Sequence, residues 1–592
     1  MLVVGLLGIA LGLVAAAYLL PPARALTVVL GTLVLVPGLL PFPHVLAGLT
    51  IHRVVALAAF AGLVRRIWAR ELGWSVFAVP SALARLAAAL GVLGIIGVGL
   101  AQPATNLDAA ARTWEGLVGQ ALFFWVVLAL VRATGRPEQA VATLGLVVIA
   151  SAVIAVTEHV THGSYARLWY RLVPDLRDSV PAQVLATRGG DVRVRVAGDF
   201  SLAYAWPAAA TLPLLLAAAA HARERLRTAL LVGVPVLLLA VIWTYSRSVA
   251  APAVVGVLLV GFVVRDRRIG WLTAAMTGAG VLLVVASPSL QNNFSTSVDK
   301  GSIDVRLNRL PGILSLVADH PFRGIGLSGL ATSGFPGTDS TWLLGYAEVG
   351  AVGLAVLVAT LLAGFGAALR GVFCDDPRIR TTCLALAVGT LMMLLGAFSY
   401  DTFTTVASGE FYWTLVALAI ASYEGAALRP VPSVTWFGRI VVPVALLGVG
   451  FGMRALAPEH VAQTFQFETL TPYFATESAS DFGGRQLRES ACGIITQTLA
   501  RRDGVAVTCQ ALDGPGQGLL RLEARNAQDL SSLLFESVTL ARQVPTLNQF
   551  RLISRGLPTA GTPSAYRTAP AWLFAFAAGL LLPMPAAGRR EP

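Results

Sequence analysis

The sequence predicts an all-α polytopic membrane protein of about fourteen or fifteen transmembrane helices, with one small extracytoplasmic α+β domain near the C-terminus. The 592 residues are 56% hydrophobic and only 13% charged, whereas soluble domains carry about 25% charged residues. Apolar runs of about 20 residues, enough to cross a bilayer core, recur along most of the chain. Residues 457–569 differ, because their composition is that of a soluble domain.

The apolar runs define the predicted spans. The first, residues 1–20, lacks the basic start of a signal peptide and is followed by many others, which indicates a transmembrane helix. Pro37, Pro41 and Pro43 interrupt the region that follows. The predicted spans are 1–20, 25–42, 48–64, 82–100, 115–132, 138–158, 202–219, 228–244, 249–264, 269–287, 341–364, 379–399, 408–424, 436–456 and 570–587.

Short basic loops predict how the spans are oriented. All of them fall on one side of the membrane, which the positive-inside rule identifies as the cytoplasm. They are residues 65–70, 132–136, 223–227, 265–268 and 370–380. The N-terminus and three long segments, 159–201, 288–340 and 457–569, are then outside. Because basic residues mark cytoplasmic loops, the net charge of +12 need not indicate nucleic acid. No helix-turn-helix, zinc or RNA-binding signature appears in the sequence, and we expect no nucleic-acid partner.

We divide the chain into a transmembrane core (1–456), an outer domain (457–569), and a final span with a cytoplasmic tail (570–592). In the outer domain, GVAVTCQAL and QGLLRLEAR alternate as strands do, and DLSSLLFESVTLARQV has the pattern of an amphipathic helix. Because an extracytoplasmic environment is oxidising, Cys492 and Cys509 are expected to form a disulfide. Two unpaired buried thiols are the alternative. Cys374 and Cys383 are expected as free thiols at the inner side.

The run DSTWLLGYAEVGAVG, residues 339–353, opens a predicted span with polar residues. Asp339 lies at the helix N-terminus, where it either caps backbone N–H groups or takes part in chemistry. Glu348 lies about 13 Å deeper and about half a turn round the helix, so the two carboxylates cannot share a proton. We expect Glu348 to face a neighbouring helix, with an arginine as one candidate partner, and Gly350 and Gly353 to let that helix approach closely.

The segment before this run, SIDVRLNRLPGILSLVADHP, is predicted to form a helix along the membrane surface, with one apolar side. That side comprises Leu310, Ile313, Leu314 and Val317. The glycines that follow, between residues 324 and 334, predict a flexible or tightly turned connection that delivers Asp339 to the start of the span.

Arginines occur at the outer ends of two other spans. Arg193 and Arg195 belong to segment 159–201, where the excess of arginine is either incidental in a long translocated loop or part of an anion site. Arg247 lies in TYSRSVAAP, between two predicted spans. It either reaches the lipid headgroups or binds a ligand.

Taken in order, these stretches resemble the O-antigen ligase and O-antigen polymerase family of bacterial membrane glycosyltransferases. An Arg-x-x-Gly-x-Phe sequence precedes a span at residues 195–200, a Thr-x-Ser-Arg sequence ends one at residues 244–247, and a long loop ends DHPFRGIGLSGL. The last family motif starts His-Asn and runs through an aromatic residue to Glu-x-Gly-x-x-Gly. Here Asp339 and Ser340 stand in the His-Asn positions. The resemblance covers residues 115–425.

The resemblance implies a fold similar to that of the GT-C glycosyltransferases, in a bacterial inner-membrane protein whose active site faces outward. It implies an inverting, metal-independent transfer of glycan from a polyprenyl pyrophosphate-linked donor to a glycan or lipid-linked acceptor, without a cofactor. Arg195 and Arg247 would bind the leaving pyrophosphate, because a guanidinium group matches phosphate oxygens. Asp339 would be the general base. Further substrate contacts are expected from Arg193, Arg306, Arg309, Ser340, Trp342 and Glu348.

Two features bear on the exact reaction. Ligases of the family carry a histidine where this chain has Asp339, which favours a polymerase over a ligase. The outer domain faintly resembles the chain-length determinant proteins that work with polymerases; an accessory sugar-binding or assembly domain is the alternative. A chain-length regulator, or a second copy of the chain, is therefore a candidate partner. His159 and His162 are expected as exposed loop residues, and their spacing does not indicate a metal site.

Two other classes of function stay open. One is a transporter that flips lipid-linked oligosaccharide, and the other is a non-catalytic scaffold for envelope assembly. Transporters tend to show two related halves with discontinuous helices at the midplane. The sequence shows no such repeat, and its arginines gather at the predicted outer surface, which favours the enzyme.

Overall fold

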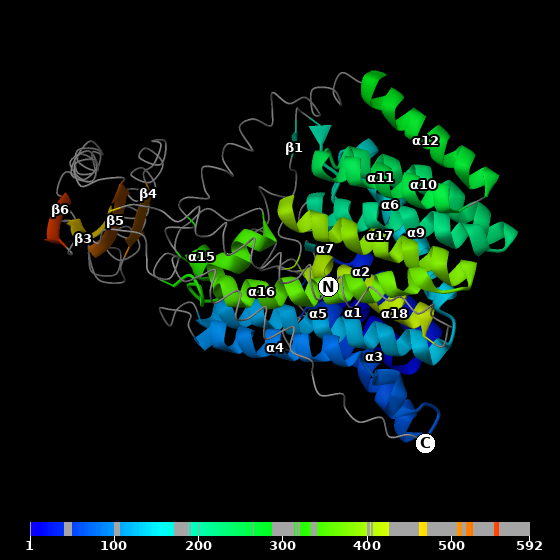
Figure 1. Ribbon diagram of the computed structural model, residues 1–592, viewed down its shortest axis with the longest axis horizontal. Helices are drawn as coiled ribbons and strands as arrows, with labels where there is room; N and C mark the ends of the chain where they lie inside the picture. The colour runs from blue at the N-terminus through cyan, green and yellow to red at the C-terminus, as the bar shows by residue number, and fades with distance from the viewer. Residues whose placement is uncertain are drawn as a thin grey trace.

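The structure is a computed structural model in which helices run side by side in a bundle (Figure 1). It describes residues 2–38, 40, 50–99, 107–170, 187–188, 191–198, 201–264, 266–286, 313, 317, 320–332, 340–399, 403, 406–424, 461–469, 506–511, 517–524 and 550–555. Every predicted span up to residue 424 coincides with a helix. The predicted spans 436–456 and 570–587 are outside the described residues.

The helices follow one another along the chain. They are α1 (Leu2–Leu19), α2 (Pro22–Leu35), α3 (Ile51–Trp68), η1 (Trp74–Phe77), α4 (Ser81–Gly99), α5 (Leu107–Thr134), α6 (Pro137–Thr161), α7 (Tyr165–Tyr170), α9 (Ser201–His221), α10 (Glu224–Trp243), α11 (Arg247–Val263), α12 (Arg267–Ala286), α15 (Gly329–Thr332), α16 (Thr341–Arg370), η3 (Gly371–Phe373), α17 (Pro377–Ser399) and α18 (Val406–Tyr423). A short hairpin, β1 (Thr187–Arg188) and β2 (Asp191–Val192), lies between α7 and α9.

Six helices in the described part of the chain are long and apolar enough to cross a membrane, namely α5, α6, α9, α10, α16 and α17. Shorter apolar runs lie in α1, α2, α4 and α11. The structure therefore supports a mostly helical, multi-pass membrane protein. The full number of fourteen or fifteen spans stays a prediction.

One predicted span is shorter than expected. The run 25–42 forms a helix only to Leu35, and Val36 already has extended backbone angles. The residue before a proline is disfavoured in the α region because the proline ring crowds its backbone, and Pro37 follows directly. Because the run stays apolar beyond Leu35, hydropathy alone does not indicate where this helix ends.

The core is centred on α9. This helix packs against α6, α10, α11 and α17, and most of its residues are buried. Trp206 is 1% exposed. Pro207 and Pro213 lie inside the helix, which is tolerated in membrane proteins because neighbouring groups satisfy the freed carbonyls. On the other side of α17, α18 packs against α5 and α16.

The predicted basic loops are the connections at one end of the bundle, here called the basic end. Arg132, in the last turn of α5, bonds Glu424 just after α18 and the carbonyls of Val76 and Ala78. The helices alternate in direction, so the opposite ends of the same helices meet at the other end. This other end, called the site end, contains the starts of α9, α11, α16 and α18 and the ends of α6 and α10. Which end faces the cytoplasm stays a prediction.

The segment predicted as an outer domain contains a four-stranded antiparallel sheet in the order β4-β5-β3-β6. The strands are β3 (Val461–Thr469), β4 (Ala506–Ala511), β5 (Gln517–Ala524) and β6 (Phe550–Arg555). Two of them fall in the stretches that alternate, 504–512 and 517–525. The expected helix, residues 529–544, is outside the described residues. An α+β domain on the outer face is therefore not established and stays a prediction.

Of the cysteine predictions, one is confirmed and one falls partly outside the described residues. Cys374 and Cys383 are free and buried, as expected. Burial raises the pKa of the Cys374 thiol, and the nearby carboxylates of Asp376 and Asp375 add to this. Cys492 is outside the described residues, so its disulfide with Cys509 stays a prediction.

Candidate active site

The helix α16, which carries the run 339–353, is interrupted at Gly350. There φ is 67° and ψ is −173°, far from helical values. The interruption lies about 14 Å from the start of the helix, at 1.5 Å per residue. A break in a membrane-spanning helix frees backbone N–H and C=O groups, which must then be satisfied by other protein groups.

The segment before α16, residues 320–332, supplies those partners. Two of its N–H groups donate to carbonyls that precede the break, and two N–H groups after the break donate to its carbonyls. The bonds are Ile325 N to Ala347 O (2.9 Å), Gly326 N to Glu348 O (2.9 Å), Ala351 N to Pro321 O (2.8 Å) and Val352 N to Phe322 O (3.3 Å). The glycine-rich connection is therefore a tightly docked segment, which we call the docking segment.

Glycine is required where α16 and the docking segment contact each other. Gly350 and Gly324 both have positive φ, 67° and 71°. A Cβ at Gly350 would collide with the main chain of Phe322, and a Cβ at Gly324 would collide with the main chain of α16. The predicted role of the glycines is therefore corrected. Gly350 admits a loop rather than a neighbouring helix, and a Cβ at Gly353 would meet Val349 of α16 itself.

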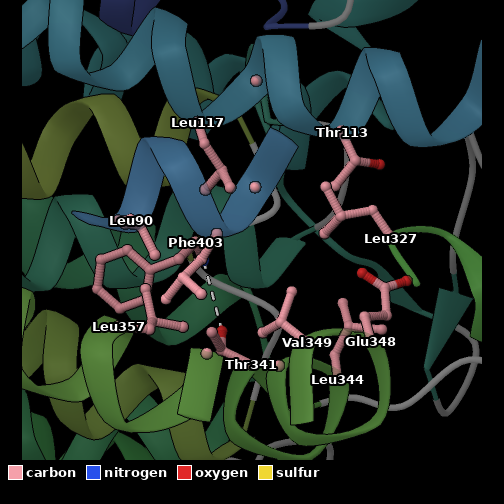
Figure 2. A pocket seen from close by; sticks show the side chains of 15 residues that line it. Leu90, Thr113, Leu117, Leu327, Thr341, Leu344, Glu348, Val349, Leu357 and Phe403 are labelled. Carbon is pink, nitrogen blue, oxygen red and sulfur yellow. Dashed lines mark hydrogen bonds between the residues drawn. The ribbon is translucent and has the colours of Figure 1, made fainter. Parts of the chain in front are cut away.

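Glu348 lies beside a small cavity enclosed mainly by α4, α5 and α16. The cavity measures about 60 Å³, and its lining is largely apolar. Figure 2 shows the Glu348 side chain leaving α16 in the direction of Leu327. Glu348 is 6% exposed. At the same cavity, Thr113 Oγ1 lies 2.7 Å from Ser328 Oγ, which ties α5 to the docking segment. The expected arginine partner of Glu348 stays a prediction.

A larger groove of about 350 Å³ adjoins this cavity. The two share four lining residues: Leu90, Leu117, Leu357 and Phe403. The groove extends between α4, α5, α16 and α18, and its other lining residues are mostly apolar or aromatic. Chemically it suits a flexible hydrocarbon chain.

The start of α16 is fastened to its neighbours. Ser340 Oγ donates to Ala397 O at 3.3 Å, and Phe403 N donates to Thr341 Oγ1 at 3.4 Å. Trp342 packs on Phe398 with ring centroids 5.6 Å apart. Ser340 and Trp342, both predicted to contact substrate, therefore lie at the site end. Asp339, Arg306 and Arg309 are outside the described residues.

The helix predicted along the membrane surface is described at two positions, Ile313 and Val317. Both are fully buried and pack against Tyr346, Ala347 and Ala351 of α16. Their spacing is the one expected for a shared face. That face packs on α16; the position of the segment along the membrane surface stays a prediction.

The two arginine-bearing turns lie together at the site end. Arg193 Nε donates to Thr244 O at 2.9 Å, and Arg193 Nη2 donates to Ser246 Oγ at 3.1 Å. Val194 N also donates to Trp243 O at 3.3 Å. The sequence motifs at 193–198 and 244–247 thus form one unit. Arg193 joins the turns, with two of its donors engaged within the protein.

Both turns contain a residue in the left-handed backbone region. Val196 has φ 50° and Tyr245 has φ 52°. For a β-branched or bulky residue this region is strained, and such strain persists only where surrounding contacts impose it. Strained residues of this kind gather at functional sites, which marks these turns as candidates.

Glu158, on the last turn of α6, holds the first of these turns. Its Oε2 accepts hydrogen bonds from Arg195 N (3.1 Å) and Val196 N (2.9 Å), and its Oε1 accepts one from Tyr165 N (2.5 Å). Glu158 and Arg195 are each 4% exposed, and their charges interact. Sequence analysis missed this residue. The signal was an acidic residue at the end of the predicted span 138–158, since intramembrane acids are usually functional.

The second turn leads into α11, whose first residue is Arg247 and whose N-cap is Ser246. The helix α9 begins at Ser201, just after the first turn. Two helix N-termini therefore adjoin the arginine-bearing turns. Because N-termini carry partial positive charge and free N–H groups, this end of the bundle favours an anion.

The two histidines behave differently from each other. His162 is exposed, as predicted. His159 is half-buried on α6 and stacks on Trp243, with ring centroids 4.2 Å apart and planes 11° apart. The expectation of an exposed loop residue is therefore wrong for His159. Its helix extends three residues beyond the predicted span.

This bundle of apolar helices, with the two arginine-bearing turns and the start of the interrupted helix α16 at one end, defines a multi-pass membrane protein with a polar site at that end. Residues 232–358 match the family model described as O-Antigen ligase. This match covers about a fifth of the chain and supports the O-antigen ligase and polymerase family, whose members are glycosyltransferase-type enzymes. The match runs from α10 through the docking segment to just past the break in α16. A comparison with curated proteins gives no significant match.

Proposed function

We propose that this chain transfers glycan from a polyprenyl pyrophosphate-linked donor to a sugar hydroxyl at the extracytoplasmic face, as a polymerase rather than a ligase. The observation that carries the proposal is the bonding of the two arginine-bearing turns to each other at the bundle end where α16 starts. The family match supports the glycosyltransferase class, and the Asp339 position supports the polymerase.

Positive charge at the site end suits the leaving pyrophosphate. Arg247 opens α11 and is the first candidate to bind phosphate oxygens directly. Arg195 is buried in this conformation, so its charge acts through the low-dielectric interior. The N-termini of α9 and α11 add partial charges of the same sign. By analogy with other oxyanion donors, each strong donor would contribute about 3 kcal/mol to the transition state.

The proposed reaction is a single displacement at the anomeric carbon. The acceptor oxygen forms a bond to that carbon while the bond from the carbon to the pyrophosphate oxygen breaks. Asp339 takes the hydroxyl proton, and the polyprenyl pyrophosphate leaves with the bonding electrons. Attack opposite the leaving group inverts the configuration. The step is balanced without a metal ion or a cofactor.

The apolar groove supports a lipid-linked donor. It is large enough for part of an isoprenoid chain, and it joins the cavity beside Glu348 near the start of α16. A lipid in this groove would have its tail among the side chains of α4 and α5 and its head at the site end. A free sugar nucleotide would gain nothing from such a groove.

One observation favours a transporter as the second candidate. Discontinuous helices are common at transporter substrate sites, and α16 is discontinuous at Gly350. The break, however, shares four hydrogen bonds with the docking segment, which satisfy two carbonyls before it and two N–H groups after it. We therefore rank transport below transfer.

The test is to incubate the purified chain in liposomes with a polyprenyl pyrophosphate oligosaccharide and resolve the products by size. A ladder of repeats supports a polymerase. One added step on a second lipid identifies a ligase. Movement of the donor across the bilayer, with no new glycosidic bond, identifies a transporter and contradicts the proposal.

A further inference from the structure

The last turn of α6 contacts both arginine-bearing turns from one side. Glu158 bonds the main chain of the first turn, at Arg195 and Val196. The neighbouring His159 stacks on Trp243, which precedes the second turn. Arg193 provides the third contact, because it joins the two turns to each other. The three contacts form a closed arrangement in which two consecutive residues of α6 support both turns.

The carboxylate of Glu158 is engaged in a way that fixes backbone position. A buried carboxylate is costly unless it accepts several hydrogen bonds or faces a positive charge. Glu158 has both, because it accepts three main-chain N–H bonds and its charge interacts with Arg195. One of those donors is the N–H of Val196, the residue with strained φ. The bond therefore holds the strained turn closed.

We propose that Glu158 is a positioning residue for glycan transfer, which fixes the place of Arg195, and that His159 does the same for the turn before Arg247. This inference rests on the proposed function. Neither residue touches the reacting atoms in this proposal. Each acts through the turn that it supports.

Two variants of Glu158 separate positioning from simple charge balance. E158A removes both carboxylate oxygens and with them all three accepted hydrogen bonds. E158Q leaves one amide oxygen, which can still accept from Arg195 and Val196, while its NH₂ group faces the N–H of Tyr165. If Glu158 only neutralises Arg195, the two variants have equal effects. If it positions the turn, E158A is much worse than E158Q.

The expected results are stated for transfer by the purified variants. Because a displacement of about 1 Å can cost about 100-fold in rate, E158A should lower kcat by about 100-fold. Its KM for the donor should change by less. E158Q should lower kcat by about 10-fold. H159A should lower kcat, while H159F, which keeps a ring to stack on Trp243, should restore most of it.

The matched control is E410Q. Glu410 is fully buried like Glu158, but it lies on α18, where its Oε2 is 2.9 Å from His52 Nδ1. A glutamine amide there can donate to His52 Nδ1 while His52 Nε2 keeps its hydrogen bond to Val36 O, so the pair keeps its hydrogen bond. E410Q should transfer glycan at the rate of the unaltered chain. Losses by E158A and E410Q alike would show a general intolerance of buried glutamate changes and overturn the inference.

Hydrogen exchange of the amides in residues 193–198 tests the inference separately from the function. E158A should speed exchange at Arg195 and Val196, whatever reaction the chain performs, and unchanged exchange would overturn the positioning role. If the unaltered chain makes no glycosidic bond, the proposed function fails, while the exchange result still decides on Glu158. If the unaltered chain is active and folded E158A keeps its kcat, the inference fails alone.

Discussion

Arginines at the two ends of the bundle are used in different ways. At the basic end, Arg227 pairs with Asp266 at 2.6 Å, and both side chains are at least one-fifth exposed. At the site end, Arg195 is 4% exposed. Its turn is held by two main-chain N–H groups that donate to the Glu158 carboxylate. Arg193 donates to the Thr244 carbonyl and the Ser246 hydroxyl.

The difference indicates what each end is built for. Exposed ion pairs add little stability and tolerate change. Buried charges, left-handed residues such as Val196 and Tyr245, and a helix break at Gly350 all cost free energy. A fold keeps such features where they serve an activity, so mutations that disturb the arginine-bearing turns should affect catalysis, whereas mutations at the basic end should affect only stability.

The largest expected effect comes from Asp339→Asn, a change at the proposed general base. Removing a general base typically lowers turnover by about 10²- to 10⁴-fold. Donor affinity should change far less, because an amide can still occupy the site. Turnover and donor binding of the purified variant measure the two effects. An unchanged turnover would reduce Asp339 to a helix cap and leave the reaction without its proposed base.

Arg247→Ala tests the anion site. Losing one oxyanion donor costs about 10²- to 10³-fold in rate, so transfer should fall by about that factor while the variant stays folded. The matched control is Arg227→Ala, an arginine near the start of α10 at the basic end, which should retain transfer. Normal turnover by Arg247→Ala would remove pyrophosphate binding from the mechanism.

Gly350→Ala tests whether the break in α16 needs glycine. The change puts a Cβ at positive φ and against the main chain of Phe322, which should cost about 3 kcal/mol of stability or more. A marked fall in thermal midpoint in detergent measures it. Gly366→Ala, on the same helix with nothing within 4 Å, should be neutral or slightly stabilising. Equal midpoints for the two variants would contradict the described docking.

The fold was predictable from sequence where apolar length alone decides structure. The spans through residue 424 all coincide with helices, because a run of apolar residues in a bilayer has few other ways to satisfy its backbone. The exact ends were less predictable. Leu35 ends α2 before Pro37, and α6 continues past residue 158, since caps and prolines rather than hydropathy set these ends.

The site was predictable at the level of motifs and not of contacts. The turns at Arg195 and Arg247 were identified, but nothing in the sequence shows that Arg193 joins them. Gly350 was assigned to close helix packing, because periodicity alone cannot distinguish a helix groove from a helix break. Glu158 is visible in the sequence only as an acid at the end of a predicted span, and its hydrogen bonds with the main-chain N–H groups of residues 195 and 196 carry no sequence signal.

The smallest effect belongs to Asp266→Asn at the basic end. Burial would raise the pKa of Asp266, but the N–H of Arg268, the Arg227 guanidinium and the N–H of Ile269 outweigh it and lower the pKa. Because the folded-state pKa lies below the unfolded value, the carboxylate adds stability above the unfolded pKa, and this is lost as pH falls through the folded pKa.

At neutral pH the variant should therefore be less stable by about 0.5 kcal/mol, since the pair is partly exposed and screened by salt. The difference in thermal midpoint should shrink as the pH is lowered below the folded-state pKa of Asp266, and also as salt is raised. Glycan transfer should be unaffected, because Asp266 lies at the end away from the arginine-bearing turns. A loss of transfer here, comparable with that of Arg247→Ala, would erase the functional contrast between the two ends of the bundle.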